Sequence, residues 1–463
     1  TKQEIGSLPF HAWQNPIMSP EKTSRAGSPS DLDGHAAPHS STGQHDSAHS
    51  TNSLNHDNEK ATNDPNAAPD GGFRAWMVAA GSATIFFCTL GLSNSFGIFQ
   101  EYYMTHQLQG QSASNISWIG STQSFLQFFT GMLAGPLFDR HGNLIMYPAA
   151  VLYVFTLMML SLCSKYWHFM LVQGILMGLV QGFLQIPAFA AVAQYFDKKR
   201  AAALGLAVAG SSVGGVVMPI ILSKLFNSSP ISFGWSVRIV GFIVLFFMTF
   251  AVISVKPRVP PRKTKLFLLD PWKQTRFLIF TVALFIIFVG MFTPNFYLPT
   301  YAVSKGMGAA LAGHLIAIIN ATSTFGRIVP GILADKYGNL NTFSIGSIAT
   351  GVIVFCMTSA TDNAGIIVYA VFFGLGSGTI MSGAAASLSR CAPDPSEVGT
   401  YMGMGMAVAG VGALIGPPIN GAIVGATGNF SAVSMFSGAI TVAGGLFAFT
   451  IKTTDKAGLW GKA

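Results

Sequence analysis

Charged side chains are scarce in this 463-residue sequence, where Asp, Glu, Lys and Arg make up 10% of the residues, against about 25% in a soluble domain. Half of the residues are hydrophobic, so the chain has too little polar surface to cover a globule in water. Its apolar runs reach about twenty residues, the length of a membrane-spanning helix, and lack the alternation over about ten residues that marks a β-barrel strand. The sequence therefore predicts an all-α membrane protein in a lipid bilayer.

Other missing features exclude further classes. The four cysteines lie far apart, so neither a disulfide framework nor a metal site is visible. Basic residues are scattered over short loops and form no aromatic-interleaved surface for nucleic acid. No glycine-rich stretch is followed by the lysine of a phosphate-binding loop, which argues against an ATP-driven pump. Clustered His and carboxylates at depth are also missing, so we expect no metal, no cofactor and no enzymatic activity.

The first 70 residues differ from the rest. They are rich in Ser, His, Asn, Asp and Pro and hold six of the ten histidines, which predicts a disordered tail over 1–70. The histidines are irregularly spaced, so we interpret them as part of a solvated low-complexity segment and not as a metal site.

Twelve apolar segments follow this tail, and each is long enough to cross a bilayer. The segments are 75–100, 115–137, 144–163, 168–192, 201–226, 232–255, 277–302, 310–334, 342–360, 365–388, 397–424 and 430–451. The most basic stretch of the chain, 256–276, separates the sixth segment from the seventh and is predicted to link two halves, 71–255 and 277–453. Residues 454–463 form a short C-terminal tail.

The basic residues predict the orientation in the membrane. If the N-terminus is cytoplasmic, the loops after the even-numbered spans and the C-terminal tail together hold sixteen Lys and Arg, and the opposite loops hold about four. Both termini are therefore expected in the cytoplasm. The plasma membrane is the expected location, with the vacuolar membrane as the alternative, and we expect the protein to function as a monomer.

Internal repeats divide the chain into two related halves. They pair 135–142 with 331–338 at an offset of 196, 178–182 with 374–378 at the same offset, and 205–210 with 405–410 at an offset of 200. Three matches in register predict two pseudo-symmetric six-helix halves. A bundle of this kind places its substrate site between the halves near mid-membrane and works by rocking one half against the other.

The first repeat has the pattern G-x-x-x-D-[RK]-x-G in both copies. Its Asp can face the positive N-terminal end of a neighbouring helix, and its basic residue can pair across a gate. The pattern resembles the hallmark cytoplasmic loop of the major facilitator superfamily, where these loops latch the cytoplasmic side in the outward-facing state. The resemblance implies the major facilitator fold and gating roles for Asp139, Arg140, Asp335 and Lys336.

Two further segments resemble the monocarboxylate-porter branch of that superfamily, of fungal type. PDGGFRAW over 69–76 is similar to the branch's motif before the first span, and YFDKKRA over 195–201, with Gly205 and Gly210, is similar to its fifth-span signature. Animal members carry lactate-like acids with protons, whereas fungal members are associated with riboflavin uptake or export of secondary metabolites. The resemblance therefore implies a small organic solute as the partner of this chain.

Arg327 is the one charge predicted deep in the membrane. It precedes Asp335 by eight residues, which places it about 12 Å inside the helix end. Asn320 and Ser323 share its face, so this stripe fits a cavity wall with Arg327 as the ligand of an anionic solute. The alternative is a structural role, in which the guanidinium bonds helix carbonyls or a distant polar group.

The animal porters have an Asp one turn before this Arg and a Lys on the first span. The corresponding positions here are Ser323 and about Asn94. By this resemblance, proton and lactate symport is not expected, and facilitated diffusion of a larger polar solute, or export, is preferred.

Further polar residues interrupt the spans. Gln181 and Gln185 share a helix face, and Asn295 and Tyr301 lie in the seventh segment. Each lines the cavity or bonds neighbouring helices, and both interpretations stay open. His314 lies inside a span as a candidate proton relay, although a histidine satisfied by water or backbone at a helix end fits as well.

These observations predict a secondary transporter that moves a small organic solute, such as a monocarboxylate, a riboflavin-like molecule or a secondary metabolite, by alternating access. The alternative is a membrane nutrient sensor or receptor that binds its solute on a transporter scaffold without moving it.

Overall fold

The computed structural model describes residues 68–227, 231–261 and 269–453, and over these ranges it is helical with no strand. The all-α prediction is confirmed for the described residues. The predicted tail over 1–70, except for its last three residues, lies outside them, as do 262–268 of the linker and the C-terminal tail 454–463.

The first half runs from α2 to α10. Its helices are α2 (Gly72–Ser93), α3 (Phe96–Tyr102), α4 (Ala113–Phe129), α5 (Gly131–His141), α6 (Met146–Leu160), α7 (Tyr166–Phe169), α8 (Gly178–Tyr195), α9 (Arg200–Asn227) and α10 (Phe233–Ser254). A π-helical stretch, Met170–Met177, makes α7 and α8 one continuous rod.

The second half runs from α11 to α17. Its helices are α11 (Thr275–Met291), α12 (Thr293–Ser304), α13 (Ala309–Tyr337), α14 (Asn339–Phe355), α15 (Asn363–Cys391), α16 (Val398–Thr427) and α17 (Phe430–Phe449). These bounds match the twelve predicted segments to within a few residues at most ends.

Eleven stretches of the described residues are long and apolar enough to cross a membrane. The stretch Asn115–Leu160 has 46 residues, or about 69 Å of helix, which is twice the thickness of a bilayer core. It turns back at Gly142, whose φ of 62° only glycine adopts readily. It therefore contains two spans, the total is twelve, and Gly338 makes the same turn in the second half with φ of 101°.

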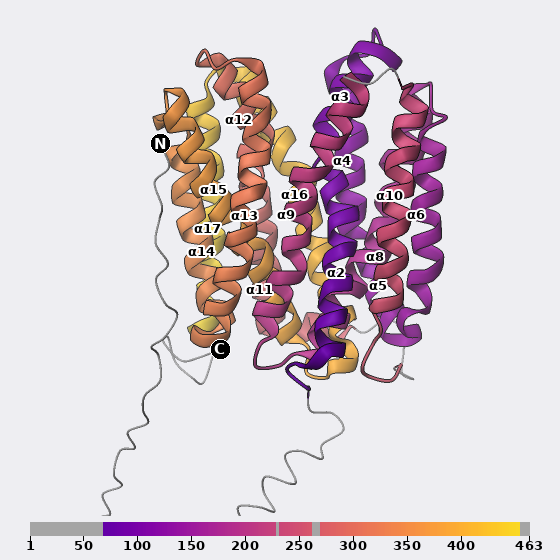
Figure 1. Cartoon of the computed structure of the whole chain (residues 1–463). Coiled ribbons are helices and arrows are strands. Elements are labelled where there is room, and N and C mark those ends of the chain that lie inside the picture. The colour runs from indigo at the N-terminus through magenta and orange to yellow at the C-terminus, as the bar shows by residue number, and fades with distance from the viewer. Residues whose placement is uncertain (1–67, 228–230, 262–268, 454–463) are drawn as a thin grey trace, which may run out of the picture. The chain divides into compact units, whose positions relative to one another are not determined.

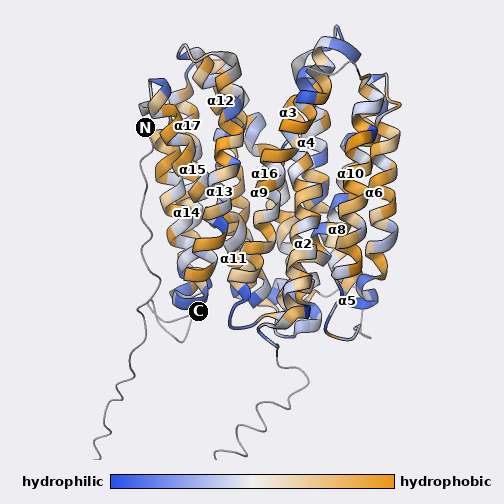
Figure 2. Ribbon diagram, in the orientation of Figure 1, coloured by the Kyte–Doolittle hydropathy of each residue, from blue (hydrophilic) through white to orange (hydrophobic). Residues whose placement is uncertain are grey.

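The two halves form two helix bundles that lie side by side (Figure 1). The bundles meet along two seams: α9 packs against α13, and α16 packs against α5 and α4. Hydrophobic residues cover the outer faces of both bundles (Figure 2), and large side chains such as Phe246, Val151 and Phe325 are exposed there. Such faces are stable in lipid and not in water.

Glycines allow the close approach of the bundles. A Cβ on Gly135 would strike the Gly399 backbone, and a Cβ on Gly403 would strike the Gly131 carbonyl. In the other seam, a Cβ on Gly205 would strike the Arg327 carbonyl. Small residues at these crossings let membrane helices pack backbone to backbone.

Candidate functional site

Both seams are latched at one end of the bundle, which we call the basic end: the region where α5 and α13 end and α9 and α16 begin, with Lys198, Lys199, Arg200 and Arg390. Asp139, at the end of α5, is 4% exposed. Its carboxylate accepts hydrogen bonds from the Gly399 and Thr400 amides, at 3.0 and 2.6 Å, and from the Thr400 hydroxyl at 2.6 Å. A negative side chain thus faces the positive N-terminus of α16 across the seam.

Asp335 makes the corresponding contact in the other seam. Its carboxylate, at the end of α13, accepts from the Ala201 and Ala202 amides in the first turn of α9, both at 2.9 Å. Each half therefore supplies one carboxylate and one helix N-terminus to the contact between the halves.

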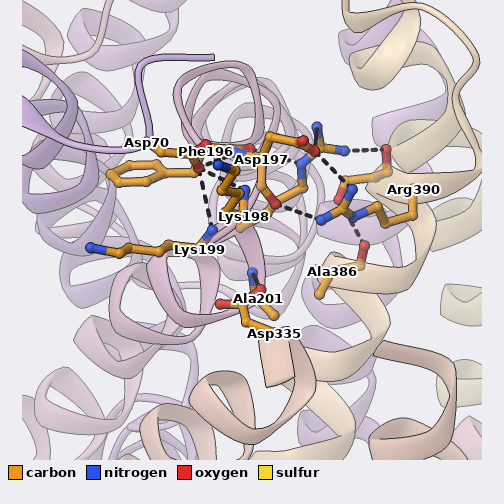
Figure 3. A network of polar contacts seen from close by, with 11 residues as sticks. Asp70, Phe196, Asp197, Lys198, Lys199, Ala201, Asp335, Ala386 and Arg390 are labelled. Atoms are coloured by element: carbon orange, nitrogen blue, oxygen red, sulfur yellow. Dashed lines mark hydrogen bonds and ion pairs between the residues drawn. The ribbon is translucent and has the colours of Figure 1, made fainter. Parts of the chain in front are cut away.

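A salt bridge joins the halves beside this contact (Figure 3). Asp197, in the loop between α8 and α9, lies 2.8 Å from Arg390 of α15, and Arg390 also donates to the Asp197 carbonyl at 2.5 Å. Asp70 holds this loop in place, because its carboxylate accepts from the amides of Asp197 and Lys198 at 2.6 and 2.7 Å. Asp70 adopts a positive φ of 51° to do so.

Arg140 and Lys336, the basic residues of the repeated motif, are exposed at the basic end. The Lys336 ammonium lies 5.2 Å from the Tyr337 ring centre. Among the described residues neither forms an ion pair across the seam, and the inter-half ion pair is the one between Asp197 and Arg390. Their gating role stays a prediction.

Arg327 lies in the α9–α13 seam, ten residues or about 15 Å from the end of α13. Its side chain is 7% exposed. One terminal nitrogen donates to the Val208 carbonyl at 2.8 Å and to the Ser211 hydroxyl, both in the opposite half. Its Nε has no partner, and no carboxylate of the described residues pairs with it. The repeat offset of 196 matches Arg327 with Gly131, so the first half has no equivalent cation.

Ser323 and Asn320, the other residues of the predicted polar stripe, precede Arg327 on α13 and lie in the same seam. The Ser323 hydroxyl lies 2.8 Å from the Ser212 hydroxyl of α9. Asn320 accepts a hydrogen bond from the exposed Asn94 side chain at 3.3 Å, and a Cβ on Gly215 would contact both amides. Residues of the predicted site thus bond the two halves together at this level.

Asn94 lies where the first span is broken between α2 and α3. The seventh span is broken at Phe292, between α11 and α12, 198 positions later. Broken helices at matching positions of two repeats mark the binding region in many transporters, because their ends leave backbone groups available to a solute.

Gln181 and Gln185 are buried inside the first half with two glutamines of α4, in what we call the glutamine cluster: Ser93, Gln123, Gln127, Gln181 and Gln185. Gln181 donates to the Thr89 carbonyl at 3.2 Å and accepts from Gln123 and Ser93, both at 3.3 Å. Gln185 donates to Gln127 at 3.5 Å. These contacts join α2, α4 and α8, and a role of the cluster in solute binding stays a prediction.

Tyr301, Asn295 and His314 lie apart from these bonded groups. The Tyr301 hydroxyl donates to the carbonyls of Thr358 and Ala360, at 3.2 and 2.9 Å, and so ties α12 to the turn after α14. Asn295 is half-buried on α12, and His314 is exposed on α13. The structure does not bring any of the three into contact with Arg327.

Sequence reasoning missed the partners on α9. Gly205 and Gly215 pack against α13 in the seam, and Ser211 and Ser212 between them are the hydrogen-bond partners of Arg327 and Ser323. The pair Ser211 and Ser212 among the glycines of this span was the sequence feature that could have indicated polar contacts here. The pairing of Asp197 with Arg390 was also missed, because the two residues lie 193 positions apart in the sequence.

This arrangement can bind an anion or an acceptor-rich group. A buried guanidinium without a counter-charge is costly in a membrane interior, and a solute carboxylate, enolate or carbonyl would reduce that cost. The seam around it offers hydroxyl and amide groups as further donors and acceptors. Among the described residues no group of His, Cys, Asp and Glu could hold a metal ion.

Comparison with known proteins identifies relatives across the chain. The profile of the Major Facilitator Superfamily matches residues 81–371 and 330–463. The aspyridones efflux protein apdF of Emericella nidulans is 50% identical over 390 residues, which cover 84% of this chain and 80% of that protein. The agnestins efflux protein AgnL12 of Paecilomyces divaricatus is 37% identical, with coverage of 84% and 90%.

Solved structures share the fold at low sequence identity. The human organic anion transporter MFSD10 (TETRAN) superposes with a TM-score of 0.65 at 14% identity, covering 81% of this chain and 98% of that one. FucP in the outward conformation superposes with a TM-score of 0.64 at 16% identity, covering 80% and 97%.

Proposed function

The chain belongs to the major facilitator superfamily, and we propose that it is a secondary transporter that exports a small organic solute across the plasma membrane by alternating access. Its relatives are transporters and not enzymes. It is an integral membrane protein with multiple spans, and its family handles small solutes. The direction of transport, the solute class and the mechanism are the parts that we propose.

The proposed solute is an acidic or acceptor-rich organic molecule. Arg327 is the observation that carries this proposal, because it is the buried cation of the inter-half seam and no carboxylate of the described residues neutralises it. A solute with a carboxylate or an ionised enol would supply the missing charge, and neighbouring Asn320 would bond its neutral oxygens. Monocarboxylates and riboflavin-like molecules stay as alternatives within the same chemistry.

The direction of transport is inferred from relatives. Two fungal relatives are named as efflux proteins for aspyridones and agnestins, which supports export of a secondary metabolite here. The membership in the monocarboxylate-porter branch stays a prediction.

Alternating access is supported by the two latches at the basic end. We propose that this end is cytoplasmic, as the loop charges predict, and that the structure represents the state closed toward the cytoplasm. Solute passage would then require the carboxylates of Asp139 and Asp335 to leave the helix N-termini of the opposite half while the halves rock.

Counterflow in proteoliposomes would test the proposed function. Proteoliposomes that contain the full chain would be loaded in turn with fungal acidic metabolites, monocarboxylates and riboflavin. Solute movement would be measured for wild type, Arg327→Gln and Arg327→Lys. We expect at least a tenfold loss for Arg327→Gln, and partial activity for Arg327→Lys, which keeps the charge but not the planar fork.

Arg238→Gln is the matched control, because Arg238 is also a helix arginine bonded to a serine hydroxyl, that of Ser161 at 3.0 Å, but within one half. It should transport at the wild-type rate per folded protein. Unchanged transport by Arg327→Gln would exclude the anion site. Binding without any movement of solute would favour the sensor.

A further inference from the structure

The residues of the glutamine cluster are not equally bonded. Gln181 uses both ends of its amide, because its Nε2 donates to the Thr89 carbonyl at 3.2 Å and its Oε1 accepts from Gln123 at 3.3 Å. Gln127 and Gln185 share one long bond of 3.5 Å, from Nε2 of Gln185 to Oε1 of Gln127. Within the described residues, Nε2 of Gln127 and Oε1 of Gln185 have no hydrogen-bond partner. The pair therefore keeps one donor and one acceptor unused.

These two unused atoms belong to buried residues but are not sealed. Gln127 is 4% exposed and Gln185 is 1% exposed. The described side-chain atoms that lack both a partner and contact with solvent include the hydroxyls of Tyr369 and Ser387, but no atom of the glutamine cluster. The free donor and the free acceptor thus remain accessible. Because buried polar groups almost always have a partner, an accessible pair of this kind points to a polar ligand.

The cluster borders the space between the two halves. Its helices α4 and α8 both pack against α16 of the other half. The Ser93 hydroxyl lies 3.3 Å from Oε1 of Gln127, and the next residue, Asn94, bonds Asn320 of α13. Asn94 is exposed although it is bonded across the halves, so the space that it faces lies between the bundles and not in the surrounding lipid.

The duplicated half has no amide at the corresponding places. By the offset of 196, Gln127 corresponds to Ser323 and Gln185 to Met381. The second half instead supplies Arg327, whose guanidinium has no carboxylate partner among the described residues. The two halves therefore offer different groups to one solute: a cation on α13, and a pair of neutral amides on α4 and α8.

The distance between these two groups follows from α13. Asn320 precedes Arg327 by seven residues, which is about 10 Å of helix, and Asn320 bonds Asn94 next to the cluster. A solute that contacts both groups is therefore on the order of 10 Å long. A three-carbon acid such as lactate is too short, whereas an acid built on two or three rings is long enough.

We propose that Gln127 and Gln185 form an amide subsite, which takes an amide or lactam group at the end of the solute opposite to its acid. This inference rests on the proposed function, because it assigns the second end of the same solute. An amide presents a carbonyl oxygen beside an N–H, so it accepts from Nε2 of Gln127 and donates to Oε1 of Gln185. The solute class is then an acid with an uncharged, amide-like far end.

Two matched probes test the subsite by binding alone. Both are rigid biphenyl carboxylic acids, which carry a primary amide at the far end in one probe and a methyl ester in the other. The melting temperature of the full chain in detergent, followed against each probe, gives the apparent affinities. We expect wild type to bind the amide about tenfold more tightly, because the ester has no N–H and leaves the Gln185 oxygen without a donor.

Variants assign this preference to the cluster. Gln185→Met should reduce it to about twofold or less and leave the affinity for the ester unchanged or raised. Gln127→Met should weaken both probes severalfold, because both carry the carbonyl that Nε2 of Gln127 contacts. Gln194→Met is the matched control, because Gln194 is a buried glutamine of the same helix, 4% exposed, whose oxygen accepts from the Arg258 amide at the basic end. It should keep the tenfold preference.

The amide subsite is overturned if neither probe binds, if wild type binds both equally, or if Gln127→Met and Gln185→Met both keep the preference. Arg327→Gln separates this result from the proposed function. It should weaken both probes equally and keep the preference, since it removes the contact to the acid that they share. Unchanged binding by Arg327→Gln would overturn the anion site and leave the amide subsite in place, and a preference without any counterflow would exclude transport alone.

Discussion

Replacing Asp139 by Asn should open the basic end of the transporter. The buried carboxylate accepts three hydrogen bonds from Gly399 and Thr400, and a bond to a charged acceptor contributes about 1.5–3 kcal/mol against about 0.5–1.5 for a neutral one. Asn keeps one acceptor oxygen, directs an NH₂ group at donors, and loses the charge that faces the α16 N-terminus, a further 0.3–1 kcal/mol or so.

The combined loss for the closed state is about 4–7 kcal/mol, because three bonds to a charged acceptor are replaced by two neutral ones and the charge at the helix N-terminus is lost. At about 1.4 kcal/mol per tenfold, this raises the ratio of open to closed molecules by a factor on the order of 10³ to 10⁵. Asp335→Asn should have a smaller effect of about 3–5 kcal/mol, or on the order of 10² to 10³-fold, because its carboxylate is half-buried and accepts from two amides of α9.

Spin labels at His141→Cys and Tyr337→Cys, both exposed and at the ends of α5 and α13, would report the separation of the halves by electron paramagnetic resonance. Exposed Cys356 would be replaced by Ser. We expect longer distances to gain population in Asp139→Asn. Asp270→Asn is the control, because its ion pair with Lys273 is exposed within the linker and contributes little. An unchanged distance distribution in folded Asp139→Asn, or a larger effect from Asp335→Asn, would refute the reasoning.

Three further predictions concern packing and polar contacts. Gly135→Ala should strongly reduce the yield of folded protein or the closed population, because its Cβ would strike the Gly399 backbone of the other half. Gly425→Ala should be neutral, because a Cβ there meets nothing within 4 Å. Equal behaviour of the two variants in size-exclusion chromatography would contradict this. Gln181→Leu should lower stability by about 1–3 kcal/mol, since it leaves buried groups without partners, and an unchanged melting temperature would disprove that. A double-mutant cycle of Ser212→Ala and Ser323→Ala should show a coupling of about 0.5–1.5 kcal/mol, and additive effects would show that the bond does not contribute.

Local patterns predicted most of the fold. Apolar runs such as 201–226 indicated membrane spans, because a helix needs about twenty apolar residues to cross the hydrocarbon core. Such a segment must be helical, because lipid offers no hydrogen-bond partner to the backbone. The repeated Gly135 and Gly331 segments located the two turns, and the carboxylates at 139 and 335 were correctly placed at helix ends. The contact of Asp70 with the loop after α8 lies 127 or more positions away in the sequence, so no local pattern indicates it.

The sequence by itself determined that this chain crosses a membrane twelve times in two related halves, with a cation inside one span, because insertion into lipid depends on the composition of each segment. Only the tertiary structure decided which groups meet. Arg327 meets Val208 at 119 positions of separation, and Asp139 meets Gly399 at 260. Such contacts depend on how two bundles are placed against each other, and no local pattern of hydrophobicity encodes that placement.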